Sequence, residues 1–263
     1  MSDDVSPKDR FVTVYGRKPV LEALQDPALA VDKVILADNA VGAVAREILQ
    51  AARLRAVPVQ RATAQRVKVL AGNGRHDQGV LADVVAPRMR TLSAALAAGR
   101  DVPETVLLLD GVTTPANVGM ILRTATAAGI GGVVVPRRGV ATIDPLVVKA
   151  SAGVAFRAPI LRTATAGAAA EGLIEAGFGL YAMAADGEST LFEVELPRRV
   201  AFVLGGETHG VSPEVAELVM GRVAIPLAGG VESLNVASAA AVLSFELARR
   251  RQASRQHRAG GGG

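Results

Sequence analysis

Apolar positions repeat in two ways along this chain, and the two patterns alternate. Short apolar runs, typical of buried strands, are separated by segments in which apolar residues recur every three or four positions, as on one face of a helix. In the first third of the chain the pattern predicts strands at 11–15, 33–37, 57–60 and 79–85, and helices at 19–24, 41–55 and 63–70. This alternation predicts a compact α/β unit that can fold by itself.

The rest of the chain carries continuous apolar runs, which indicate parallel strands buried on both faces. The first run, Thr105 to Leu109, ends at Asp110-Gly111 and is followed by a helix with Thr114 as N-cap and Pro115 in its first turn. The pattern predicts strands at 105–109, 132–135, 179–184 and 201–204, and helices at 115–128, 144–149, 164–176 and 213–220. Strands that alternate with helical crossovers predict a parallel sheet.

The stretch from Ile225 to Leu247 predicts a strand that stops at Pro226, a glycine-rich loop, and a helix opened by Ser233 as its N-cap. Apolar residues with helical spacing should face a core: Val236, Ala240, Leu243 and Leu247. The loop offers backbone groups to a small ligand, although a plain connection between strand and helix explains this segment equally well.

Turn-forming residues and charge divide the chain into four parts. We expect an N-terminal domain at residues 1–88, a linker at 89–104 with a short alanine-rich helix at 92–98, a second domain at 105–252, and a disordered tail at 253–263. Within the first domain, the polar residues 71–78 predict a surface loop.

Composition excludes several classes of protein. The 263 residues contain no cysteine, so a disulfide scaffold, a thiolate zinc site and a catalytic thiol are excluded, and the three histidines are too scattered to predict a metal site. No apolar run is long enough to cross a membrane, and the polar N-terminus does not resemble a secretion signal, so we expect a soluble cytoplasmic protein. The net charge of +4 is weak evidence for a polyanionic partner. The many basic residues of the N-terminal domain fit a polyanion-binding surface or a solvated face equally well.

Three loops follow predicted parallel strands, around Asn117, Glu207 and Ser233. Ligands of parallel sheets bind at that edge, so these loops are expected to converge. None of them carries a G-x-G-x-x-G fingerprint, a Walker lysine loop or a G-x-S-x-G elbow, which argues against NAD binding, P-loop ATPase chemistry and α/β-hydrolase chemistry.

The same loops resemble a known family. Residues 117–125 (Asn-Val-Gly-Met-Ile-Leu-Arg-Thr-Ala), residues 204–210 (Leu-Gly-Gly-Glu-x-x-Gly), and Ile225-Pro226-Leu227 with Ser233-Leu234-Asn235-Val236 resemble the three ordered motifs of the SpoU/TrmH RNA ribose 2′-O-methyltransferases, which belong to the SPOUT superfamily. Each motif alone is weak, but the three in order form a specific signal.

The N-terminal domain extends the resemblance to nearly the whole chain. Its segments 14–16 and 76–80 are similar to the small ribosomal-protein-like substrate domain of the ribosomal RNA branch of this family. Two positions depart from the pattern: Thr114 stands where relatives often carry Asp, and Asp77 is inserted into what is usually His-Gln-Gly. Neither departure affects the chemistry that the resemblance implies.

The resemblance implies an α/β fold whose C-terminal parallel-sheet domain contains a deep trefoil knot. It also implies a homodimer with its active site at the subunit interface, and S-adenosylmethionine (AdoMet) bound in the knotted loops. The residues carried over as cofactor-binding are Leu204, Gly206, Ile225, Leu227 and Leu234, with Ala184 as a further wall.

The resemblance also assigns catalytic residues. Arg123 matches the catalytic arginine, and because a guanidinium is normally never deprotonated, we expect it to stay charged, bind the adjoining phosphate and stabilise the developing alkoxide. Asn117 would hold Arg123 or the ribose, Glu207 would orient the arginine or accept a hydrogen bond, and Ser233 and Asn235 would complete the RNA-facing pocket. Taken singly, each of these residues also has an ordinary structural explanation. His209 receives no catalytic role.

The expected function is therefore AdoMet-dependent methylation of a ribose 2′-hydroxyl in structured RNA, with ribosomal RNA favoured by the N-terminal domain. The expected partners are RNA and a second copy of the chain, without a membrane or a metal. Three alternatives stay open at this point: a transfer RNA ribose methyltransferase, a catalytically inactive RNA-binding assembly factor of the same fold, and a dinucleotide-dependent oxidoreductase.

Overall fold

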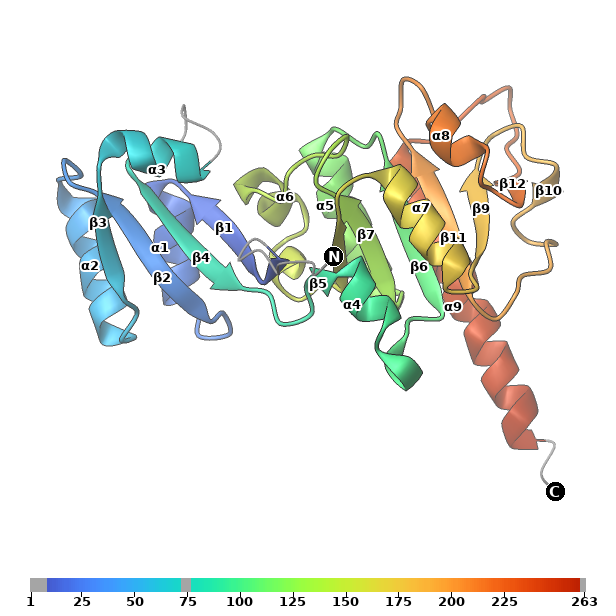
Figure 1. The fold of residues 1–263 in the computed structure, drawn as a ribbon, viewed down its shortest axis with the longest axis horizontal. Helices are drawn as coiled ribbons and strands as arrows, with labels where there is room; N and C mark the ends of the chain where they lie inside the picture. The colour runs from blue at the N-terminus through green and yellow to red at the C-terminus, as the bar shows by residue number, and fades with distance from the viewer. Residues whose placement is uncertain (1–8, 72–76, 261–263) are drawn as a thin grey trace.

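A computed structural model describes residues 9–71 and 77–260 of the chain, which form two α/β units side by side (Figure 1). The N-terminal unit is a four-stranded sheet with the strand order β1-β4-β2-β3. Its elements are β1 (Phe11–Tyr15), α1 (Arg17–Gln25), β2 (Val31–Ala37), α2 (Ala43–Leu54), β3 (Val59–Ala62), α3 (Ala64–Ala71) and β4 (Val80–Val85). Helices α1 and α2 pack on one face of this sheet and α3 on the other.

Every strand and helix predicted for this unit is present, with small shifts at the ends. Strand β3 begins two residues later than predicted, at Val59, because Pro58 has no N–H to donate to the sheet. Of the surface loop predicted at 71–78, residues 72–76 lie outside the described residues. Asp77 is buried rather than exposed, and its Oδ1 accepts a hydrogen bond from the Gly79 N–H at 2.8 Å.

The C-terminal unit is an eight-stranded sheet in which every pair of neighbours is parallel. The strand order is β10-β12-β9-β11-β6-β7-β8-β5. The strands are β5 (Arg90–Thr91), β6 (Thr105–Asp110), β7 (Gly132–Pro136), β8 (Ile160–Thr163), β9 (Gly179–Met183), β10 (Ser189–Thr190), β11 (Val200–Gly205) and β12 (Gly221–Ala224). All six residues of β6 are buried, as expected for a strand that is covered on both faces.

Helices cover both faces of this sheet. The helices α5 (Pro115–Ala127), α6 (Pro145–Ala150) and α9 (Val236–Gly260) pack on the face to which Leu107 and Leu109 point. The helices α4 (Leu92–Leu96), α7 (Ala166–Glu175) and α8 (Pro213–Ala216) pack on the opposite face, against Val106 and Leu108. Short 3-10 turns lie at Gly99–Asp101 and Val154–Phe156. The fold is thus the α/β class that the sequence predicts, whereas the trefoil knot stays a prediction.

Four segments differ from the sequence prediction, besides strand β10, whose two residues are too few to show a period. Within the predicted linker at 89–104, β5 pairs with β8 and the buried side chains of α4 join the second core, so this stretch belongs largely to the C-terminal unit. Strand β8 was not predicted, because Arg162 interrupts its short apolar run. Helix α8 ends at Ala216 instead of residue 220, since the Met220 N–H already bonds to Leu180 O at 2.7 Å and draws the chain back toward the sheet.

The fourth difference is the C-terminal segment, for which the sequence predicted a disordered tail at 253–263. Helix α9 continues to Gly260. The residues after 252 are mainly alanine, arginine and glutamine, which are good helix formers, and no glycine interrupts them before Gly260.

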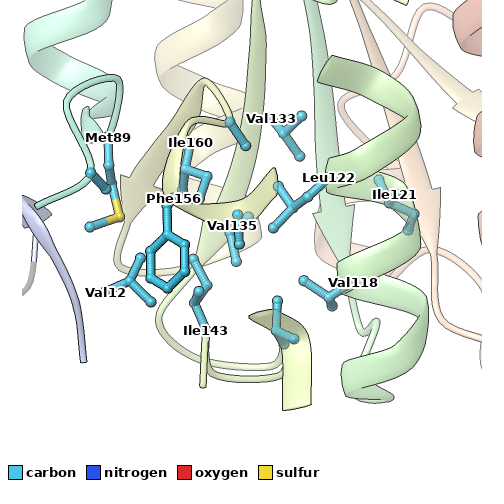
Figure 2. Close-up of a cluster of buried hydrophobic side chains, with 14 of the residues drawn as sticks. Val12, Met89, Val118, Ile121, Leu122, Val133, Val135, Ile143, Phe156 and Ile160 are labelled. Atoms are coloured by element: carbon cyan, nitrogen blue, oxygen red, sulfur yellow. The ribbon is translucent and has the colours of Figure 1, made fainter. Parts of the chain in front are cut away.

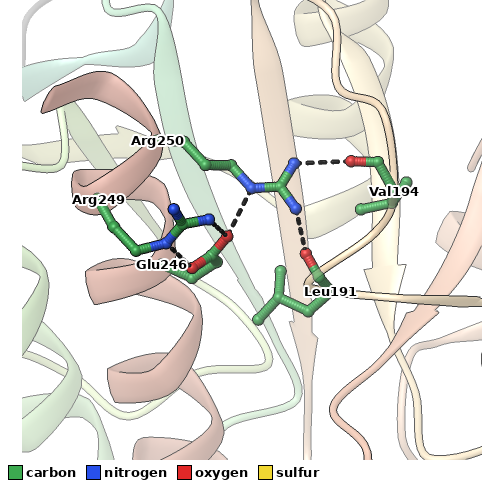
Figure 3. Close-up of polar contacts among 5 residues, drawn as sticks. All are labelled: Leu191, Val194, Glu246, Arg249 and Arg250. Atoms are coloured by element: carbon green, nitrogen blue, oxygen red, sulfur yellow. Dashed lines mark hydrogen bonds and ion pairs between the residues drawn. The ribbon is translucent and has the colours of Figure 1, made fainter. Parts of the chain in front are cut away.

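The middle of α9 is fixed to a distant loop by an ion cluster (Figure 3). The Glu246 carboxylate accepts hydrogen bonds from Arg249 and Arg250, and Arg250 also donates to Val194 O at 2.7 Å and to Leu191 O at 2.5 Å. Hydrogen bonds from Arg249 and, to a smaller extent, from Arg250 lower the pKa of Glu246 to about 2. Desolvation raises this pKa but only partly offsets the hydrogen bonds. This cluster ties the loop before β11 to the helix.

The two units share an apolar contact (Figure 2). Val12 of β1 lies beside Met89, Ile143 and Phe156, and all four side chains are buried in one continuous cluster. Polar contacts flank it: Tyr15 Oη donates to Asp144 Oδ2 at 3.1 Å, and Arg137 forms an ion pair with the buried Asp9. Within the described ranges, none of the helices has the length and apolar character needed to cross a membrane.

Candidate functional site

A pocket of about 880 Å³ opens at the carboxyl ends of β9, β11 and β12. The residues predicted to bind the cofactor all line it: Ala184, Leu204, Gly206, Ile225, Leu227 and Leu234. Three of the residues predicted to be catalytic line it as well: Glu207, Ser233 and Asn235. The fold therefore brings these segments together, and the role of each residue stays a prediction.

One wall of the pocket is a tight glycine loop after β11. Gly206 and Gly210 exchange two backbone hydrogen bonds of 3.0 and 2.9 Å, which close the loop on itself. A Cβ atom on Gly206 would lie 2.3 Å from the carbonyl oxygen of Gly111, and one on Gly205 would lie 2.3 Å from the carbonyl carbon of Gly210. Glycine is therefore required for the backbone segments to approach this closely.

The opposite wall is the segment between β12 and α9. Strand β12 ends at Ala224, one residue before the predicted strand end at Ile225-Pro226. The predicted N-cap was wrong: Ser233 lines the pocket, and Asn235 caps the helix, since its Oδ1 accepts from the N–H groups of Ala237 at 2.9 Å and Ser238 at 3.4 Å. Asparagine caps as well as serine does, and Asn235 directly precedes the first helical residue.

Three polar side chains join the loops into one hydrogen-bonded network. Asn117 Nδ2 donates to Glu207 Oε1 at 2.7 Å, and Asn235 Nδ2 donates to the same oxygen at 2.9 Å and to Asn117 Oδ1 at 3.1 Å. Asn117 is only 4% exposed, in the first turn of α5, whereas Glu207 is exposed at the tip of its loop. We call Asn117, Glu207 and Asn235 the pocket network. It leaves the Glu207 carboxylate with unused acceptor capacity at the rim of the pocket.

Arg123 lies apart from the pocket network. It stands six residues after Asn117, so its side chain leaves the helix axis in a direction about 240° further round and points to another face of α5. This face is exposed. In the described part of this chain, no hydrogen bond or ion pair joins its side chain to Asn117 or Glu207, and the roles predicted for these two residues, toward Arg123 or toward the ribose, stay predictions. Likewise, Thr114 precedes α5 as its N-cap, but its side chain makes no capping hydrogen bond.

The helices α5 and α9 each expose a large apolar side chain. Met120 on α5 is 41% exposed and Phe245 on α9 is 55% exposed, and these two helices pack against each other. Met120 lies one helical turn before Arg123, so the guanidinium borders this apolar surface.

The pocket also contains His209, for which the sequence predicted no catalytic role, and two charged residues that sequence reasoning missed. His209, Asp186 and Arg222 line it, and Asp186 forms an ion pair with Arg222. The Asp186-Gly187 pair after a predicted strand is a turn signal that could have placed Asp186 at this edge. No local pattern identifies Arg222. Among residues 9–71 and 77–260, no cluster of three or more metal-ligating side chains of the His, Cys, Asp or Glu type is present.

The chemistry of the pocket suits a nucleoside-sized ligand. Its volume falls within the usual range for small-molecule sites, and apolar residues and glycines are among those that line its walls. Leu204, Ile225, Leu227 and Leu234 provide apolar contacts, and the pocket network supplies polar groups at one end.

Comparisons with known proteins agree with this geometry. Residues 104–245 match the family described as SpoU rRNA Methylase, and residues 13–90 match the family described as RNA 2′-O ribose methyltransferase substrate binding. A curated relative, the 23S rRNA (guanosine-2′-O-)-methyltransferase RlmB of Xanthomonas axonopodis pv. citri, is 35% identical over 243 residues, which cover 90% of this chain and 96% of the relative.

Two solved structures extend the similarity to three dimensions. The SpoU methyltransferase AviRb from Streptomyces viridochromogenes, in complex with AdoMet, matches with a TM-score of 0.61 and 26% identity, covering 92% of this chain and 90% of that chain. An AdoMet-bound rRNA methyltransferase from Sinorhizobium meliloti matches with a TM-score of 0.58 and 26% identity, covering 92% and 88%.

Proposed function

The chain belongs to the SpoU rRNA methylase family, and from this premise we propose that it transfers the methyl group of AdoMet to the 2′-oxygen of a ribose in ribosomal RNA. The observation that carries the proposal is the pocket network, which joins three loops at the mouth of a nucleoside-sized pocket. The similarity to a 23S rRNA methyltransferase over both units, including residues 13–90, supports ribosomal RNA over transfer RNA as the substrate. Such a substrate is consistent with a cytoplasmic reaction.

The pocket residues fit AdoMet. The apolar walls at Leu204, Ile225, Leu227 and Leu234 suit the flat adenine ring, and the glycine loop at Gly206 adds backbone to the wall of the pocket. When bound, AdoMet supplies an electrophilic methyl group. Ala184 completes the wall on the side of β9.

The residues of the chain would position the ribose and stabilise charge. Methyl transfer to a hydroxyl depends on holding the oxygen in line with the methyl group, so positioning provides a large part of the rate. Asn117 and Asn235 hold the Glu207 carboxylate, whose remaining lone pairs can accept a hydrogen bond from a ribose hydroxyl, and Ser233 adds a hydroxyl on the same side. The guanidinium cation of Arg123 would bind phosphate and stabilise negative charge on the 2′-oxygen, while the proton of the hydroxyl leaves to phosphate or water.

We further propose that the protein acts as a homodimer in which Arg123 of the partner subunit completes each pocket. Two observations support a second copy: Arg123 lies apart from the pocket of its own chain, and the neighbouring helices α5 and α9 expose the apolar side chains of Met120 and Phe245, which suit a subunit interface. Burying this surface in a dimer would bring Arg123 of one subunit to the other.

The test of the reaction uses labelled AdoMet and three transcripts without modifications: 23S rRNA, 16S rRNA and a tRNA pool. We expect label in ribosomal RNA, and nucleoside analysis should locate it on a ribose 2′-oxygen. Label on bases, or label in tRNA alone, would contradict the proposal. Calorimetry with AdoMet separates an enzyme from an inactive assembly factor, since the latter would show no binding.

The test of the dimer mixes two inactive variants, Arg123→Ala and Glu207→Gln. If Arg123 acts across the interface, exchange of subunits creates one intact pocket in each mixed dimer, and activity returns to about half of the wild-type level per mixed dimer. Activity that stays absent after exchange, while native mass spectrometry detects the mixed dimers, would show that Arg123 and Glu207 act within the same subunit.

A further inference from the structure

We propose that a basic junction between the two units, formed by Arg137, Arg138 and Arg162, binds phosphate groups of the RNA and guides the strand from the N-terminal unit to the pocket. The inference deepens the proposed function and rests on it, because it names the path of the same substrate.

The junction carries an excess of positive charge. Arg137 forms an ion pair with Asp9, which is 1% exposed, and Arg162 Nη1 donates to Val135 O at 2.7 Å. Burial and, to a smaller extent, the neighbouring Arg137 lower the pKa of Arg162 to about 10, although the carboxylate of Asp9 raises it. The guanidinium therefore stays charged at neutral pH. Three guanidinium groups therefore stand against the carboxylates of Asp9 and Asp144, and this excess of positive charge makes the junction attractive to an anion.

Arg138 is the member of the junction that is available to a ligand. It is exposed, and across residues 9–71 and 77–260 its side chain makes neither a hydrogen bond nor an ion pair. Its backbone is nevertheless fixed, because its N–H bonds to Ala164 O at 3.2 Å, while the N–H of Arg137 bonds to Thr163 O at 2.9 Å. A guanidinium with free donors on an anchored loop is suited to the forked, two-oxygen geometry of a phosphate.

The position of the loop connects the two units. It follows β7 at the carboxyl edge of the parallel sheet, and the Ala141 N–H bonds to Val112 O at 3.0 Å, so residues 137–141 lie against the loop that leads to Asn117. On its other side, the Asp9 and Tyr15 contacts hold the N-terminal unit against Arg137 and Asp144. Figure 1 shows β7 and α6 between the N-terminal unit and the strands that carry the pocket.

Charge and position together point to an RNA backbone. The junction lies between residues 13–90, which match a substrate-binding family, and the pocket network, so a strand held at both ends would pass over it. The chain contains only 3% aromatic residues, which favours contacts with phosphates over stacking of bases.

The experiment measures how binding of an unmodified 23S rRNA transcript depends on salt. For Arg138→Gln we expect a loss of affinity on the order of tenfold at about 0.1 M salt, as for one charge-assisted contact. The slope of log K against log salt should fall by about 0.7 to 0.9, since one phosphate contact is lost. The matched control is Arg100→Gln, because Arg100 is also exposed but lies in the turn Gly99–Asp101, just before the amino end of β6.

Arg100→Gln should leave affinity and slope unchanged, and both variants should bind S-adenosylhomocysteine like the wild type, which verifies the fold. The inference is overturned if Arg138→Gln keeps the wild-type slope, or if Arg100→Gln lowers the slope equally, because the effect would then be general electrostatics. A wild-type protein that binds AdoMet but no ribosomal RNA would overturn the proposed function itself.

Discussion

Helix α9 carries two polar networks, and they differ in what they leave open. At its start, Asn235 joins Asn117 and Glu207 in the pocket network. Further along, Glu246 binds Arg249 and Arg250, and Arg250 reaches two carbonyl groups of the loop before β11. Both networks therefore fix a distant loop to the same helix.

Only the second network is closed. Glu246 is 7% exposed, and both of its oxygens accept hydrogen bonds from guanidinium groups at 2.7 to 2.8 Å. Glu207, by contrast, is exposed, and its hydrogen bonds from Asn117 and Asn235 converge on a single oxygen. A carboxylate with bound partners on all sides stabilises the fold, whereas one with free lone pairs at a pocket can also bind a ligand.

This difference predicts opposite responses to mutation. Changes at the pocket should reduce methyl transfer more than stability, and changes at the Glu246 cluster should reduce stability more than methyl transfer.

The largest contrast is expected between two arginines. Arg123→Ala should lower kcat/KM by about 100- to 1000-fold, since it removes a charge that stabilises the transition state, and should leave the melting temperature unchanged because the side chain is exposed. Arg250→Ala should lower the free energy of unfolding by about 2 to 3 kcal/mol, because it leaves buried partners without donors. At low temperature, where it stays folded, its transfer rate should be close to that of the wild type. Full activity of Arg123→Ala would remove this residue from the mechanism.

The next contrast separates the two roles of Asn235. Asn235→Ser retains a side chain that can cap α9 but is too short to replace the amide that donates to Glu207 and Asn117. We expect turnover to fall by about 30- to 100-fold with stability preserved. Asn235→Ala should show the same loss of turnover and, in addition, lose about 1 kcal/mol of stability with the cap. Thermal unfolding and single-turnover kinetics on the pair measure both effects, and a fully active serine variant would reduce Asn235 to a helix cap.

The sequence predicted where the pocket lies but not how it is held together. Each pocket segment follows a buried apolar run, and the carboxyl ends of parallel strands share an edge, so their convergence could be inferred locally. The hydrogen bonds of the pocket network join Asn117 to residues that lie 90 and 118 positions further along the chain. A local sequence pattern cannot reveal contacts at such separations. The cap was misplaced because Ser233 and Asn235 are both good N-cap residues two positions apart.

Two strands, β5 and β8, were not predicted for a different reason, which is their short length or their charge. Strand β5 has two residues, too few for any period, and β8 contains Arg162, whose charge the fold accommodates through Val135 O. The proposed role of Arg123 involves a second copy of the chain, which the pattern of one chain cannot position.

A smaller effect on ligand affinity is expected from a mutation in the glycine loop that carries Glu207 of the pocket network. In Gly206→Ala, the new Cβ would meet Gly111 O at 2.3 Å, so the loop must shift, and we expect affinity for S-adenosylhomocysteine to fall by about tenfold with a loss of about 1 to 3 kcal/mol of stability. The control is Gly172→Ala in α7, where a Cβ would lie 3.9 Å from Leu96 and should instead stabilise the helix by about 0.5 to 1 kcal/mol. Calorimetry that finds equal affinities for the two variants would contradict a tight loop.

The smallest effect concerns the closed network and depends on pH. The pKa of Glu246 is lowered from 4.5 to about 2 in the folded protein, chiefly by hydrogen bonds from Arg249. A lowered pKa in the folded state means that the carboxylate contributes stability above the unfolded value of 4.5, and that this contribution is lost as the pH falls toward 2. Glu246→Gln should therefore cost on the order of 1 to 2 kcal/mol at neutral pH, less than full linkage would give, because solvent screens the exposed Arg249. Urea unfolding of both proteins at neutral pH and near about pH 3 measures the difference, which should shrink at the lower pH. If the stability difference is the same at both pH values, Glu246 acts through packing alone. If Glu246→Gln loses more methyl transfer than Asn235→Ser does, the two networks do not differ in the way described.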